Sequence, residues 1–289
     1  MTAIFLDAVI DTLKLIPFLF VTYLIMEAFE ARTADDTSQM LAKVGPFGPI
    51  VGAGVGLIPQ CGFSAAASSL FAGGLISPGT LIAVFLSTSD EMLPIFLSEH
   101  VALSTLGRIL AAKAAIAVIT GLVIDMVIKL LKPKAPKHIH DLCEHDHCGC
   151  EEDHGGGFPA ICRAALKHTL NITLFIFIIT VALAFVVEGV GSNAIANFLA
   201  NRPAFGVCLS ALIGLIPNCA ASVMLTQLYL SRLITAAQMI AGLSVGAGVG
   251  LLVLFRTNRP MKENIILTLV LYGAGVAWGL LFELLHLSF

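Results

Sequence analysis

The sequence predicts an all-α polytopic membrane protein with about ten transmembrane segments, arranged as two five-segment inverted repeats. The 289 residues are 57% hydrophobic and only 12% charged, and the mean hydropathy is +0.94. A soluble chain of this length needs far more charged surface. Apolar stretches of bilayer-spanning length recur along the chain, and one short motif occurs twice at a separation of 158 residues.

Six apolar stretches are predicted to be unbroken transmembrane helices. They cover residues 13–29, 78–97, 106–131, 170–187, 234–255 and 265–285. Two other stretches, 47–74 and 205–230, contain a central proline, Pro59 or Pro217. A proline in mid-helix removes a backbone hydrogen bond, and lipid cannot satisfy the carbonyl that this leaves. Each of these stretches is therefore predicted to form two shorter helices that meet at a break away from lipid.

The repeated motif defines the organisation of the chain. Gly56-Leu-Ile-Pro-Gln-Cys61 recurs as Gly214-Leu-Ile-Pro-Asn-Cys219, and the register holds from Glu30 with Glu188 to Gly121 with Gly279. Such a duplication is typical of transporters with inverted repeats. We predict a first membrane repeat in residues 1–131, a connector rich in His and Cys in 132–160, and a second membrane repeat in 161–289.

Charge placement predicts the orientation. Five segments in each half would invert the second half, and Lys and Arg then gather on one side, which the positive-inside rule makes cytoplasmic. Lys113 fits neither side. We expect an integral protein of the bacterial inner membrane with a cytoplasmic connector, and we expect no removable signal peptide, because the N-terminus lacks a basic region before its apolar segment.

The paired breaks are the first candidate substrate site, because helix ends expose dipoles and unpaired carbonyls there. The candidate ligands are amides, thiols and hydroxyls of Gln60, Cys61, Ser64, Ser68, Asn218, Cys219, Ser222 and Thr226. Thiolates suit soft metals and metalloids, whereas oxygen ligands suit harder cations such as manganese, and the set does not choose between them. The alternative is that the motif marks a tight turn, with buried cysteines and with serines that ease helix contact.

A polar cluster within the 78–97 stretch is the second candidate. Ser89, Asp90 and Glu91 lie at a depth where charge is costly, so we expect them to face a cavity and to act as cation ligands or proton carriers. The alternative is that the helix ends early and both acids lie in a loop.

The connector is the third candidate. Its ligands are His138, His140, Cys143, His145, His147, Cys148, Cys150 and His154, interleaved with acidic residues. The spacing lacks the paired motifs of a closed zinc module, so it predicts a loose metal trap that concentrates or senses metal. The alternative is an inert polar linker.

The chemistry that the sequence lacks also restricts the function. It contains no Walker A motif, no HExxH pair and no nucleophile beside a base, so we expect no enzyme and no required cofactor. The net charge of −3 and the lack of a long basic stretch argue against a nucleic-acid partner. Any pumping would use an ion gradient.

These residues resemble a family of ten-transmembrane heavy-metal exporters, an ArsP-like group labelled arsenic efflux proteins or manganese transporters. The resemblance spans essentially the whole chain and rests on both GLIP[QN]C motifs, the segment Ser87-Thr-Ser-Asp-Glu-Met-Leu-Pro94 and the connector. Permeases with a similar Pro-x-Cys break at duplicated positions are associated with arsenical export, which implies a role for Cys61 and Cys219.

The leading hypothesis is a secondary exporter of metal or metalloid ions, such as manganese, other divalent heavy metals or arsenite, driven by proton antiport. Asp90 and Glu91 would supply its negative charge. The expected partners are the ion, the coupling proton and membrane lipid, and a homo-oligomer is an open alternative. Two other functions remain: a permease for organic arsenicals or other small solutes, and a non-transporting membrane metal sensor or scaffold.

Overall fold

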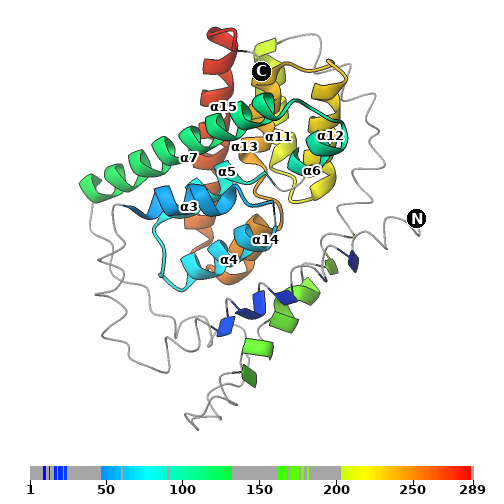
Figure 1. The fold of residues 1–289 in the computed structure, drawn as a ribbon. Coiled ribbons are helices and arrows are strands. Elements are labelled where there is room, and N and C mark those ends of the chain that lie inside the picture. The colour runs from blue at the N-terminus through cyan, green and yellow to red at the C-terminus, as the bar shows by residue number, and fades with distance from the viewer. Residues whose placement is uncertain are drawn as a thin grey trace.

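The computed structural model shown in Figure 1 is a helical protein with several apolar helices. It describes residues 47–59, 61–89, 92–131 and 203–287, together with parts of 9–24 and 162–181. Every regular element in these ranges is a helix. Four helical stretches in them are long and apolar enough to cross a membrane: Pro78–Ser98, Leu103–Leu131, Ala236–Thr257 and Met261–Leu284. The all-helical, membrane-compatible class is thus confirmed.

Five labelled helices lie on each side of the connector. The first set is α3 (Gly48–Gly56), α4 (Cys61–Ala72), α5 (Pro78–Ser87), α6 (Met92–Ser98) and α7 (Leu103–Leu131). The second set is α11 (Pro203–Gly214), α12 (Cys219–Leu230), α13 (Ala236–Val245), α14 (Val249–Thr257) and α15 (Met261–Leu284). Helices α12, α13 and α15 begin 158 residues after α4, α5 and α7, which is the separation of the repeated motif.

The two helix breaks predicted at the motifs are confirmed, but Ile58 and Pro59 at the first break are exposed and not buried as expected. Helix α3 ends at Gly56 and α4 begins at Cys61, with Pro59 between them. Helix α11 ends at Gly214 and α12 begins at Cys219, with Pro217 between them. In both places the proline stands where no helical amide hydrogen is needed.

Two predicted helices, 78–97 and 234–255, are not continuous. Helix α5 ends at Ser87, the C-cap residue Thr88 has ψ 127°, and α6 resumes at Met92. Pro94 explains the restart, because it lies in the first turn of α6, where its missing amide hydrogen costs nothing. Between α13 and α14 the cause is glycine: Gly248 has a φ of +53°, a left-handed conformation that glycine adopts easily.

The interrupted helices form the centre of the molecule and the long helices its periphery. Helices α5 and α13 contact each other, and each also contacts the other helices of its own half, α3 and α7 or α11 and α15. About three quarters or more of the Pro78–Ser98 and Ala236–Thr257 stretches is buried, at 75% and 83%, against 17% for α7 and 28% for α15. The long helices expose leucine, valine and methionine side chains, as expected for surfaces that face lipid.

Helices of each half pack against helices of the other half at the centre of the molecule. Helix α4 of the first half packs against α14 of the second, and α12 of the second half packs against α6 of the first (Figure 1). At the first contact Ser68 Oγ donates to the carbonyl oxygen of Gly250 at 2.6 Å. A Cβ atom on Gly250 would lie 2.8 Å from the Ser64 backbone, so the two helices approach as closely as glycine permits.

The same packing contacts occur in each half. A Cβ on Gly121 of α7 would lie 2.7 Å from the Gly79 carbonyl oxygen of α5, and a Cβ on Gly279 of α15 would lie 3.2 Å from the Ala237 carbonyl oxygen of α13. Gly279 follows Gly121 by 158 residues, and Ala237 follows Gly79 by the same number. The long helix of each half is therefore seated against its central helix through an equivalent glycine.

A carboxylate also caps each central helix. Asp125 of α7 accepts hydrogen bonds from Ser77 Oγ at 2.6 Å and from the Gly79 amide at 2.8 Å. Glu283 of α15 accepts one from Thr235 Oγ1 at 3.2 Å. Acidic groups at a helix N-terminus are stabilised by the unpaired amides and by the helix dipole. These two acids therefore fix the start of α5 and α13.

We predict that Gly250→Ala lowers the free energy of unfolding by about 1–3 kcal/mol, because the new methyl group meets the Ser64 backbone rather than a flexible side chain. Gly273→Ala is the matched control: it lies within α15, and nothing lies within 4 Å of its added Cβ. Both changes add one methyl group to a helical glycine, and only Gly250→Ala places it against another helix, so the sign of their difference reports the steric effect. Thermal unfolding in detergent measures it, and a Gly250→Ala protein at least as stable as the Gly273→Ala protein would contradict the packing.

Candidate functional site

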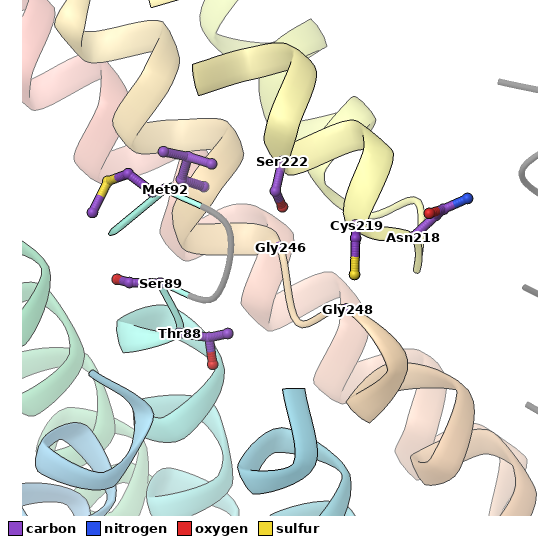
Figure 2. A pocket seen from close by; sticks show the side chains of 9 residues that line it. Thr88, Ser89, Met92, Asn218, Cys219, Ser222, Gly246 and Gly248 are labelled. Atoms are coloured by element: carbon purple, nitrogen blue, oxygen red, sulfur yellow. The ribbon is translucent and has the colours of Figure 1, made fainter. Parts of the chain in front are cut away.

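A small buried cavity lies where the interrupted helices meet. Its volume is about 20 Å³, which is room for about one water-sized occupant. Thr88, Ser89, Met92, Asn218, Cys219, Ser222, Leu243, Gly246 and Gly248 line it. Figure 2 shows Thr88 and Ser89 on one side of this space and Cys219 and Ser222, both on α12, on the other.

Three helix interruptions supply the cavity wall. Ser89 belongs to the segment between α5 and α6, Cys219 is the first residue of α12, and Gly246 and Gly248 lie between α13 and α14. Polar backbone groups at such interruptions must be satisfied by protein or by what occupies the cavity, since lipid offers no partner. The arrangement thus concentrates hydrogen-bonding groups at one point of an otherwise apolar protein.

The fourth interruption, between α3 and α4, contributes a thiol that lies beside the cavity residue Cys219. Cys61, the first residue of α4, and Cys219, the first residue of α12, have their sulfur atoms 3.9 Å apart. Both are partly buried and form no disulfide. Two thiolates that share one tetrahedral ion, each at about 2.3 Å, lie roughly 3.8 Å apart. The observed spacing therefore suits a shared soft ion without movement of either helix.

The predicted hydroxyl ligands divide into two groups. Ser89 and Ser222 line the cavity. Ser64 and Ser68 of α4 are buried in the contact with α14, and Thr226 Oγ1 donates to the carbonyl oxygen of Ser222 at 2.7 Å. For Ser64, Ser68 and Thr226 the structure favours the packing interpretation.

Several predicted ligands cannot be placed. Gln60, Asp90 and Glu91 lie outside the described residues, as do all eight His and Cys residues proposed in the connector, from His138 to His154. Among the residues that are described, no three His, Cys, Asp or Glu side chains gather in a way that could hold a metal ion. The acidic ligands proposed from the sequence therefore remain predictions.

Lys113 is a site residue that the sequence analysis left unassigned. It lies on α7 and its side chain is fully buried. Its Nζ donates to the backbone carbonyl oxygens of Thr88 and, at 3.0 Å, Leu243. Both residues line the cavity. A single lysine inside a long apolar helix is itself a signal of function, because an ammonium at that depth needs a polar partner.

We predict that Cys61 and Cys219 form a disulfide under mild oxidation with copper-phenanthroline, since only a small approach of the two sulfur atoms is needed. The test uses a variant in which these are the two remaining cysteines and in which a protease site is inserted between residues 132 and 160. After cleavage the halves should migrate together when oxidised and separate when reduced. A Cys61→Ser version should always separate, and separation of the oxidised two-cysteine protein would contradict the sulfur–sulfur contact.

The site therefore offers the thiols of Cys61 and Cys219, three hydroxyls and the Asn218 amide around one ion-sized space, beside a buried ammonium. This set can bind an ion, but it contains no nucleophile activated by a neighbouring base among the described residues. No protein family model matches the chain, and no curated protein or solved structure is similar to it.

Proposed function

We propose that this protein is a secondary transporter of a metal or metalloid ion, with the cavity between the interrupted helices as its substrate site. The observation that carries the proposal is the convergence of helix interruptions on one buried, ion-sized cavity inside an apolar helical protein. In secondary transporters, discontinuous helices meet at the middle of the membrane, where their ends contact substrate and coupling ions. A structural scaffold has no need of such a costly polar centre.

The proposal includes an inverted pair of five-segment repeats. Two contacts support it, because each joins residues 158 positions apart: Cys61 with Cys219, and Trp278 Nε1, which donates to Thr120 Oγ1 at 2.9 Å. Where two equivalent units pack about a two-fold axis, a residue near the axis contacts its own counterpart. The reciprocal pairing of α4 with α14 and of α12 with α6 supports the same relation. Rocking of one half against the other about this axis would expose the cavity to each side in turn.

The ligands favour a single ion over a larger solute. The space holds about one water-sized occupant in this conformation, and the thiol pair suits zinc, cadmium or trivalent arsenic. A harder ion such as manganese would depend on the hydroxyls of Ser89 and Ser222 and on Asp90 and Glu91. We propose export by proton exchange, with the connector on the cytoplasmic side of the inner membrane.

Uptake into inverted membrane vesicles tests this function. Manganese, zinc, cobalt, cadmium and arsenite would each be offered with and without an imposed proton gradient. We expect one ion to accumulate in a gradient-dependent way, and the double change Cys61→Ser/Cys219→Ser to slow a soft ion at least about tenfold, because it removes both thiolates. Cys208→Ser is the matched control, since Cys208 lies on α11 and does not line the cavity.

Other results of these experiments would favour one of the alternative functions. If no ion accumulates although the protein is inserted, ion export is wrong. Transport of an organic arsenical that survives Asp90→Asn and is lost with both cysteines would identify a small-solute permease. A metal response that requires the connector and survives the double cysteine change would identify a sensor.

A further inference from the structure

Lys113 lies where two helices from different halves expose their C-terminal carbonyls. Thr88 is the C-cap residue of α5, and Leu243 lies in the last turn of α13. In a continued helix the Ala247 amide would bind the Leu243 carbonyl, but it donates to Val245 at 2.7 Å instead. The Leu243 oxygen is therefore available to Lys113, whose Nζ lies 3.0 Å away.

Carbonyls at the C-terminal ends of broken helices are typical ligands for cations. The helix dipole places negative partial charge there, and discontinuous helices in transporters use such ends to coordinate monovalent ions. Here the position between the two carbonyls is taken by an ammonium group that belongs to the chain itself.

Packing alone does not account for a lysine at this place. The position 158 residues later, in α15, is Leu271, which is also fully buried. An apolar side chain thus fills the equivalent space in the other half. A buried ammonium is far more costly than a leucine, so the carbonyls that Lys113 contacts must contribute to its stability.

We propose that the carbonyl oxygens of Thr88 and Leu243 form part of a monovalent-cation site, and that the ammonium of Lys113 is its permanent, tethered occupant. Tethering gives the ammonium a high effective concentration, so the site stays filled without sodium or potassium from solution. The site links α5 and α13, one from each half, and holds a positive charge beside two residues that line the cavity. This inference goes beyond the proposed transport function.

Removal of the tether should convert the site into one that binds a free cation. We expect Lys113→Ala to unfold several degrees below the wild type and to regain at least half of that loss in ethylammonium or methylammonium chloride. Choline chloride at equal ionic strength should not restore it, because its quaternary headgroup carries no N–H donor. Lys129→Ala, which removes an exposed lysine from the last turn of the same helix, should show neither effect.

The measurement is thermal unfolding of the purified full chain in detergent, followed by tryptophan fluorescence. The chain has one tryptophan, Trp278, and its bond to Thr120 makes it a reporter of α7 packing. Lys113→Gln provides a second test if the alanine variant does not fold. This variant keeps an uncharged donor, and we expect it to be less stable than the wild type and unresponsive to alkylammonium ions.

Two results would overturn the proposal: a Lys113→Gln protein as stable as the wild type, or a folded Lys113→Ala protein that no ammonium or alkali ion stabilises. Because the readout is stability of purified protein, neither result depends on transport. A protein that fails to transport any ion can still show the rescue, and a failed rescue leaves the transport proposal intact.

Discussion

Every helix interruption in an apolar environment leaves backbone amides and carbonyls that lipid cannot satisfy, so protein groups or the contents of a cavity must do so. In this protein that requirement determines where the polar side chains stand. Lys113 binds carbonyls at the ends of α5 and α13, and Asp125 binds the first amides of α5. Ser68 binds a carbonyl of α14 from the opposite half. These side chains satisfy backbone groups at helix ends that lipid would leave without a partner.

The same requirement explains the division between centre and periphery. An interrupted helix cannot face lipid, so α5 with α6 and α13 with α14 occupy the interior, and the continuous helices α7 and α15 surround them. In lipid there is no hydrophobic driving force for helix association, so close packing of small residues must hold the inner and outer helices together. Gly121, Gly250 and Gly279 stand where any side chain would meet neighbouring atoms.

Sequence alone predicted the two proline interruptions and placed Cys61 and Cys219 in one candidate site, because the repeat marks equivalent positions and proline has a local effect on the helix. It predicted 78–97 and 234–255 as unbroken helices and gave an early end before Asp90 only as an alternative, since hydropathy averages over short breaks; Pro94 and Gly248 were the available signals. Sequence alone could not predict the hydrogen-bond partners of Lys113. They lie 25 and 130 residues away along the chain, and only the fold brings them together.

Helices α12, α13 and α15 begin 158 residues after α4, α5 and α7, but the centre where the two halves meet is not symmetric. At equivalent positions the first half carries Lys113 and the second Leu271, and the first carries Asp90 where the second has Gly248. The charged residues at these positions therefore lie in one half, while the second half has Gly248, which adopts a positive φ. Lys113 also binds the opposite half through Leu243. If the halves rock as proposed and Leu243 moves away from Lys113, this bond breaks, and its energy then favours the end state that keeps it.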